Sequence, residues 1–244
     1  MKHLKLGTKL LIGGILIVAI PIIVIGIVSV YQATENTFRD KKEDIAIISE
    51  SLAGALEIGM HEQLVTIRTI SYSNSAIAAA EKVAKEGMAK SQKDMVLAEK
   101  ELIKIKKAEG DRLSSINLVD KNGIFFVSSD IKTMKGINVS KREYFTKALN
   151  GTPNVGSVNV SSATGRIVCS SASPIYSSTG KDIKGVVMMS LELKYFSDIF
   201  DKMKIGKAGY AYIVDKNGFY ITHPVKDKIL KENIFQIKGM EAVS

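Results

Sequence analysis

The chain has 244 residues, of which 45% are hydrophobic and 24% are charged, and its formal net charge is +9. This composition is that of a folded protein, and it excludes a disordered tail or a collagen-like rod. The single cysteine, Cys169, excludes an internal disulfide and any site of the Cys-x-x-Cys type.

The chain begins with a long apolar stretch. Residues 10–31 carry no formal charge, and as a helix of roughly 33 Å they would cross a hydrocarbon core about 30 Å thick. A secretory signal has a shorter apolar region and a small-residue cleavage site. We therefore predict a transmembrane helix at 10–31; a signal peptide and a buried core helix are the alternatives. The short, lysine-containing tail 1–9 is expected in the cytoplasm, which places the rest outside the plasma membrane.

Residues 32–75 are predicted to form a long stalk helix that continues from the membrane span. Between Phe38 and Ile70, apolar residues recur at steps of three and four positions, and no proline interrupts them. Such a helix could carry force between membrane and domain, or it could pair with a copy of itself. The apolar stripe alone leaves both possibilities open.

A second helical region is predicted at 76–107, with Gly87 as a possible division. Its lysines alternate with glutamate and aspartate at helical spacings, which is typical of a solvated helix face. No aromatic residue lies between Glu81 and Lys107, so there is no platform on which bases could stack. We expect no nucleic-acid partner.

From Gly110 onward the pattern changes to short apolar runs separated by turns. The Asn122-Gly123 pair joins two such runs and predicts a β-hairpin. Ser140 is expected to cap a short helix at 141–150, and 195–203 is expected to be helical again. Strands are predicted at 115–119, 124–128, 155–160, 167–175 and 185–193. The fold class is therefore α+β, with a mostly antiparallel sheet of five strands.

The pentapeptide Val-Asp-Lys-Asn-Gly occurs twice, at 119–123 and at 214–218. Both copies lie between strand-like runs, so duplication of a whole structural unit is the preferred interpretation, and a generic hairpin turn is the alternative. Only twenty residues follow Pro224, too few to complete a second unit. We therefore expect the chain to be a fragment of a longer protein.

These motifs together resemble the double Cache sensor domain of bacterial methyl-accepting chemotaxis proteins. The resemblance rests on the N-terminal span and long helix, followed by the segments SKREYFTKALNG, ATGR, ASPIY, GVVMMSLEL and GYAYIVDKNGFYITHP in that order. It implies two PAS-like units stacked on the long helix, a membrane-distal Cache unit at 76–204 and an incomplete membrane-proximal one at 205–244. It also implies a homodimer that signals to cytoplasmic partners through a part beyond residue 244.

The function implied by the resemblance is that of a transmembrane chemoreceptor that binds a small extracellular ligand and controls chemotaxis. Two alternative functions differ from this one in their output. The same input domain could serve a sensor histidine kinase or a cyclic-dinucleotide enzyme, or the chain could be a membrane-tethered binding protein without a signalling output.

In amino-acid-binding members of the family, an arginine followed by aromatic residues opens the short helix, and this chain has Arg142-Glu143-Tyr144-Phe145 there. A guanidinium can hold a carboxylate through two parallel hydrogen bonds. By alignment, the remaining family positions hold neutral residues, so a ligand ammonium would lack a carboxylate partner. An organic acid or another anion therefore fits better than an α-amino acid. The predicted ligand-binding residues are Arg142, Tyr144, Phe145, Asn159, Ser161 and Ser190.

Some of these residues also have purely structural interpretations: Arg142 could cap loop carbonyls, and Phe145 could belong to the core. The three histidines, His3, His61 and His223, lie in three different segments without metal-ligand spacing. Without a nucleophile and base in proximity, no catalytic site is predicted. We expect neither an enzyme nor a bound cofactor or metal.

Overall fold

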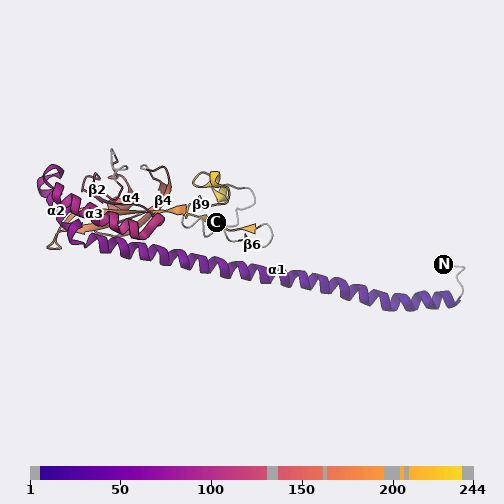
Figure 1. Cartoon of the computed structure of the whole chain (residues 1–244). Coiled ribbons are helices and arrows are strands. Elements are labelled where there is room, and N and C mark those ends of the chain that lie inside the picture. Colours follow the sequence, from indigo (N-terminus) through magenta and orange to yellow (C-terminus); the bar gives the residue numbers. More distant parts are fainter. Residues whose placement is uncertain (1–5, 131–136, 162–163, 195–203, 206–208, 238–244) are drawn as a thin grey trace. The chain divides into compact units, whose positions relative to one another are not determined.

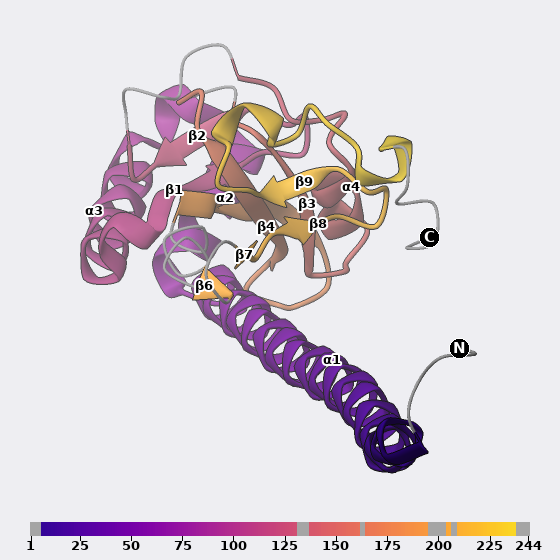
Figure 2. The same ribbon diagram turned by 90° about the vertical axis from the view of Figure 1, so that its right-hand side faces the viewer.

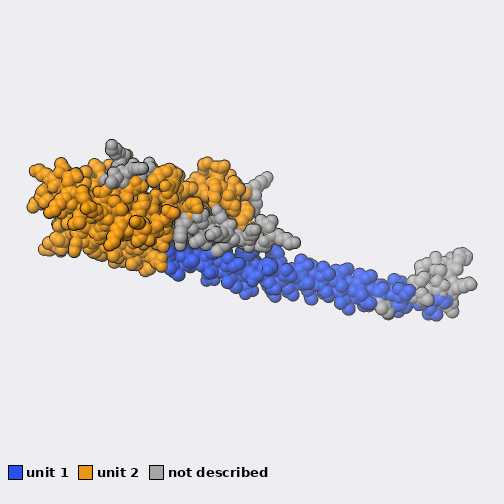
Figure 3. Space-filling view, in the orientation of Figure 1, with its two compact units in different colours: residues 1–59 blue, residues 60–244 orange. Residues whose placement is uncertain are grey.

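The computed structural model describes residues 6–130, 137–161, 164–194, 204–205 and 209–237. The chain divides into two compact units, residues 1–59 and residues 60–244 (Figure 3). The first unit consists of the greater part of one helix, α1 (Leu6–Ser71), which contains Pro21. The predicted long N-terminal helix is thus confirmed, without interruption between residues 31 and 32.

The described part of α1 contains a stretch that is long and apolar enough to cross a membrane, and no residue of that stretch is buried within the structure. Exposed side chains such as Ile17, Ile22 and Ile25 belong to it. An apolar helix surface without protein around it is what lipid would cover.

Three helical elements of the second unit precede its sheet. They are the last turns of α1, α2 (Asn74–Glu86) and α3 (Gln92–Glu109), with a short 3₁₀ helix (Met88–Lys90) between the last two. The predicted division at Gly87 is present, because this glycine ends α2 with a φ of 79°, which disfavours other residues.

A five-stranded antiparallel sheet follows, as predicted. Its strands stand in the order β2-β1-β5-β4-β3. Their bounds are β1 Leu113–Val119, β2 Phe125–Ser128, β3 Asn154–Val160, β4 Ile167–Tyr176 and β5 Ile183–Glu192. Each pair of neighbours runs antiparallel.

The two faces of this sheet carry separate apolar cores, because successive side chains of a strand point to opposite faces. On β5, Val187 and Met189 pack with the core of α1, α2 and α3, whereas Val186 and Met188 pack with α4 (Glu143–Leu149). Figures 1 and 2 show α3 and α4 on opposite sides of the strands. Cys169 on β4 is buried, and burial raises the pKa of its thiol to about 11, as expected for a core residue.

The start of α4 differs from the prediction. The helix begins at Glu143 rather than at residue 141, and Arg142, with extended backbone, occupies the N-cap position. The reason is a turn before the helix: the Asn138 side chain accepts a hydrogen bond from the backbone N–H of Ser140 (2.8 Å), and Arg142 N–H donates to the Val139 carbonyl (2.9 Å). Ser140 therefore lies two residues before the N-cap position, and no side chain among the described residues caps the helix.

The C-terminal region contains two short antiparallel pairs. One pair is β6 (Lys204–Ile205) with β7 (Gly209–Tyr210). The other pair is β8 (Ile213–Val214) with β9 (Tyr220–Thr222), and these two strands flank the turn of the second Val-Asp-Lys-Asn-Gly segment. The helix predicted at 195–203 lies outside the described residues.

Candidate functional site

Three serines stand side by side on the α4 face of the sheet. Ser170 on β4 is paired with Ser190 on β5, and Ser190 is paired in turn with Ser115 on β1. The hydroxyl oxygens of Ser170 and Ser190 lie 3.3 Å apart. This row of hydroxyls forms the floor of a pocket that we call the serine pocket.

Arg142 and Tyr144 line the serine pocket from the α4 side. The phenol of Tyr144 hydrogen-bonds to Ser170; burial raises the pKa of Tyr144, and the nearby Arg142 charge partly opposes that rise. The phenol therefore stays neutral and can donate a hydrogen bond. Its ring lies so close to β3 that only Gly156 leaves room for it, since a Cβ there would come within 2.6 Å of the ring.

The chemistry of the serine pocket is that of one cation among neutral polar groups. Among the described residues that line it, Arg142 is the only charged one. The polar lining otherwise consists of the Tyr144 phenol and of hydroxyl and amide side chains from Ser115, Asn117, Asn138, Asn159, Ser161, Ser170 and Ser190. Such a lining can hold a small anion through the guanidinium and orient its oxygen atoms through the hydroxyls.

The serine pocket is small in this structure. Its volume is about 50 Å³, which leaves room for a few water molecules, whereas pockets for small molecules commonly measure about 300–1,000 Å³. A ligand of more than a few atoms requires the side chains around it to move apart.

Five of the six predicted ligand-binding residues line this one pocket: Arg142, Tyr144, Asn159, Ser161 and Ser190. Phe145 does not. It is 1% exposed and packs in the core beneath α4 with residues such as Val186, because neighbouring residues of a helix point in different directions.

Sequence reasoning missed Ser115, Asn117 and Ser170, which share the floor of the pocket. A signal for two of them existed. In β1, Ser115 and Asn117 alternate with Ile116 and Leu118, and such alternation puts the polar pair on one face of the sheet. Asn117 also donates a hydrogen bond to the Ser115 hydroxyl (2.9 Å).

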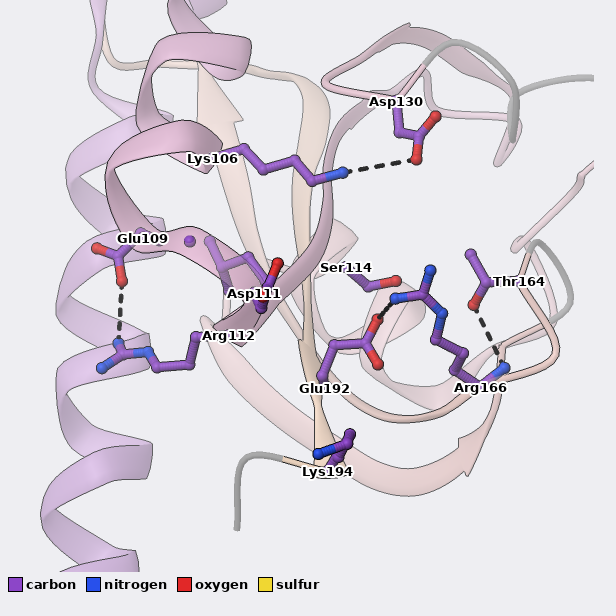
Figure 4. Close-up of a pocket in the computed structure, with 12 residues that line it drawn as sticks. Lys106, Glu109, Asp111, Arg112, Ser114, Asp130, Thr164, Arg166, Glu192 and Lys194 are labelled. Atoms are coloured by element: carbon purple, nitrogen blue, oxygen red, sulfur yellow. Dashed lines mark hydrogen bonds and ion pairs between the residues drawn. The ribbon is translucent and has the colours of Figure 1, made fainter. Parts of the chain in front are cut away.

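A wider hollow, the charged groove, lies at the end of the same sheet, with a volume of about 650 Å³ (Figure 4). Its lining includes four basic and four acidic residues: Lys106, Arg112, Arg166, Lys194, Glu109, Asp111, Asp130 and Glu192. Figure 4 shows ion pairs between Lys106 and Asp130, and between Arg112 and Glu109.

The pair between Arg166 and Glu192 differs from the other ion pairs drawn in the groove. Nη1 of Arg166 and Oε1 of Glu192 are 2.7 Å apart, and the Glu192 side chain is 8% exposed while that of Arg166 is 64% exposed. A nearly buried carboxylate is thus held by a cation that lies mostly in water. Within the described part of the chain, no group of three or more His, Cys, Asp or Glu side chains could hold a metal ion.

Comparison with known families and curated proteins identifies relatives of this chain. A family model described as Cache domain (dCache_1) matches residues 28–243. The methyl-accepting chemotaxis protein McpA of Bacillus subtilis (strain 168) is 24% identical over 226 residues, 92% of this chain and 32% of that protein. McpA of Pseudomonas putida (KT2440) is 27% identical over 110 residues, 45% of this chain and 17% of that protein. The chain is homologous to both and spans 32% or less of their length.

Solved structures show the same fold. The ligand-binding domain of the Pseudomonas fluorescens chemoreceptor CtaA with L-serine has a TM-score of 0.54 at 20% identity, covering 76% of this chain and 73% of that one. The domain of the Pseudomonas aeruginosa chemoreceptor PctC with GABA has 0.56 at 18% identity, with 78% of each chain covered. The sensor domain of the V. cholerae histidine kinase DctB has 0.61 at 15% identity, covering 82% and 70%.

Proposed function

We propose that this chain, which belongs to the Cache domain family, is the sensory region of a membrane chemoreceptor, and that its serine pocket binds a small ligand through a carboxylate. The observation that carries the proposal is Arg142, a single cation in a pocket otherwise lined by neutral groups. A guanidinium binds a carboxylate bidentately, and neighbouring hydroxyls can donate to the remaining oxygen lone pairs.

The ligand class follows from what surrounds Arg142. CtaA is seen with L-serine and PctC with GABA, so related folds hold amino acids. In this chain no carboxylate lines the serine pocket among its described residues, and an α-ammonium next to Arg142 would be buried without a counter-charge. We therefore propose an organic acid, or an amino acid whose amine is remote from its carboxylate.

The organisation of the chain in the membrane is part of the proposal. Residues 10–31 would span the plasma membrane with 1–9 in the cytoplasm, and 32–75 would form the stalk. The membrane-distal unit, 76–204, would hold the serine pocket, and 205–244 would begin the membrane-proximal unit. Two copies would pair as a homodimer. The apolar surface of α1 supports the span.

Ligand binding would signal by shifting the balance between two arrangements of the sensory region. A ligand can shift that balance only by its difference in affinity for the two states. The small volume of the serine pocket supports such a mechanism, because a ligand needs more space than the side chains leave in this arrangement. The two McpA homologues favour control of chemotaxis as the output. The likeness to DctB keeps a histidine kinase output as the second candidate.

Calorimetric titration of the full chain in lipid nanodiscs tests the proposal, with pentanoate as the probe. Arg142→Ala should abolish binding, and Arg142→Lys should weaken it, because lysine keeps the charge but loses the bidentate geometry. Arg68→Ala, at an exposed arginine of α1, is the matched control and should bind as the parent chain does. If Arg142→Ala binds pentanoate normally, or if no carboxylate binds the parent chain, the proposal is wrong.

A further inference from the structure

We propose that Glu192 is a second recognition point for the ligand of the serine pocket, and that it binds a cationic group carried by the same molecule as the carboxylate. This inference rests on the proposed function, because it assumes that Arg142 holds the carboxylate. It assigns the ligand to a narrower class, the amino acids whose amine lies at the far end of the carbon chain.

Glu192 stands one row beyond the floor of the serine pocket. Ser190 and Glu192 are two residues apart on β5, so their side chains share a face of the sheet, roughly 7 Å apart along the strand. The neighbouring strand repeats this arrangement, since Glu192 is paired with Val168 and Ser190 with Ser170. Val168, Ser170 and Ser190 line the serine pocket, whereas Glu192 lines the charged groove.

The turn between β3 and β4 contributes residues to both hollows. Ser161 lines the serine pocket, and Arg166 lines the charged groove. The backbone N–H of Ser161 donates a hydrogen bond to the backbone carbonyl of Arg166 (2.7 Å). Arg166 in turn extends its guanidinium to Glu192, as Figure 4 shows. Glu192 is therefore the acidic side chain in the next row of the sheet beyond Ser190, and a ligand that extends from Arg142 across the serines in that direction would approach the Arg166–Glu192 pair.

The unequal exposure of this pair decides which charge the ligand carries there. Glu192 is nearly buried, and a buried carboxylate without a cation is strongly destabilising. A ligand anion that took Arg166 away would leave Glu192 in that condition. A ligand ammonium that replaced Arg166 would keep Glu192 paired. The released guanidinium would lose little, because it is already mostly exposed and an ion pair made by an exposed group contributes little free energy.

The position of Glu192 also excludes the α-amino acids from this mode of binding. Their ammonium is one carbon away from the carboxylate, so with the carboxylate on Arg142 it lies over the serines. An amine at the far end of a chain of several carbons can cross the row and reach Glu192. The charged groove, with a volume of about 650 Å³, offers the space for that end of the ligand.

Three ligands with the same carbon skeleton test the inference by calorimetry on the full chain in nanodiscs: pentanoate, 2-aminopentanoate and 5-aminopentanoate. We expect 5-aminopentanoate to bind about tenfold more tightly than pentanoate, which is less than a full charged hydrogen bond would give, because the ammonium replaces a bond that Arg166 already makes to Glu192. We expect no such gain for 2-aminopentanoate. Glu192→Gln, which keeps the shape of the side chain, should remove the gain. Glu62→Gln, at an exposed glutamate of α1 that lines neither hollow, is the matched control and should keep it.

Arg166→Ala provides a second, independent measurement. It removes the internal cation with which the ligand competes, so it should raise the preference for 5-aminopentanoate over pentanoate several-fold. If Glu192→Gln does not fold, the Arg166→Ala measurement tests the inference by itself. An unchanged preference for 5-aminopentanoate over pentanoate in Arg166→Ala would overturn the inference.

The two proposals fail differently. If pentanoate binds in an Arg142-dependent way and the terminal amine adds nothing, the role of Glu192 is refuted while the proposed function stands. If no carboxylate binds the parent chain, both are refuted.

Discussion

Asn138 and Asn233, which are 95 positions apart in the chain, make the same hydrogen bonds to the turns of two separate hairpins. The side-chain amide of Asn138 donates to the Asn122 carbonyl (3.2 Å), and that of Asn233 donates to the Asn217 carbonyl (2.6 Å). Each side-chain oxygen accepts a backbone N–H from two residues further on. The repeated pentapeptide is therefore part of a longer duplicated unit that includes the asparagine following each hairpin.

The duplication is not a duplication of the binding residues. The same offset that relates Asn138 to Asn233 relates Arg142 to Ile237. The second copy thus lacks a guanidinium at the position where the first copy lines its pocket, and a carboxylate ligand has no equivalent anchor there. This difference makes the second hairpin a natural control for the first.

Replacing each asparagine by alanine should separate structure from binding. Both Asn138→Ala and Asn233→Ala remove two hydrogen bonds, so each should lower the stability of its hairpin by about 1–3 kcal/mol. Only Asn138→Ala should also weaken pentanoate binding several-fold, because its turn holds Arg142 at the edge of the serine pocket. Thermal unfolding and calorimetric titration of the two variants measure both effects. Equal losses of affinity in the two variants would contradict this assignment.

Gly156→Ala should damage the pocket through Tyr144. The added Cβ would lie 2.6 Å from Cδ1 of that ring and 3.0 Å from its Cβ, so the ring must move. We expect a loss of about 1–3 kcal/mol in stability and weaker pentanoate binding, because the phenol leaves Ser170. Gly54→Ala, where no atom lies within 4 Å, is the matched control and should not destabilise the helix. A Gly156→Ala variant with normal stability and normal binding would show that Tyr144 is not fixed in this position.

Local patterns predicted most of the elements of this fold. The Asn122-Gly123 turn and the division at Gly87 depend on the backbone freedom of single residues, and the structure places both where the sequence indicated. The apolar runs gave the five strands to within about two residues, as is common for element ends. These features need only neighbours in the chain.

Features that depend on distant segments were not predictable. The row of Ser115, Ser170 and Ser190 exists because three strands far apart in sequence pair in one register. The Arg166–Glu192 pair depends on the same register. The direction of Phe145 was open for another reason: in a helix as short as α4, the position of the first residue decides which side chains face the core, and a turn held by Asn138 sets that position.

His223 should make the second hairpin sensitive to acid. His223 is 2% exposed. The centroid of its ring lies 4.8 Å from that of Tyr220 and 5.2 Å from that of Tyr210. Its Nδ1 accepts a hydrogen bond from the backbone N–H of Val225. Burial lowers the pKa of His223 below its ordinary value of 6.5, with Lys228 and Lys226 acting in the same direction and Glu232 against them.

The sign of the effect follows from linkage. Because the folded pKa is the lower one, the unfolded chain binds more protons as the pH falls below about 6.5, and the folded state loses stability. Hydrogen exchange of the amides in 213–225 should therefore be slowest above that pH and should accelerate between pH 6.5 and 5. His223→Gln should remove this dependence after correction for the intrinsic exchange rate. A titration of the His223 ring at or above pH 6.5, observed by NMR, would contradict the mechanism.

Gln63 lies on the buried side of α1 and should be a cost to stability. It is 1% exposed, it precedes Ile67 and Ile70 on the same helix face, and neither Oε1 nor Nε2 has a hydrogen-bond partner among the described residues. An unsatisfied buried amide costs about 1–3 kcal/mol, and leucine has a similar volume and a similar helix propensity. Gln63→Leu should therefore raise the midpoint of thermal unfolding by about 2–4 °C per kcal/mol gained. Gln92→Leu, at an exposed glutamine of α3, should change it little. A lower midpoint in Gln63→Leu would mean that the amide is satisfied by a group outside this chain, such as a second copy of α1, and that this glutamine belongs to an interface instead of an apolar core.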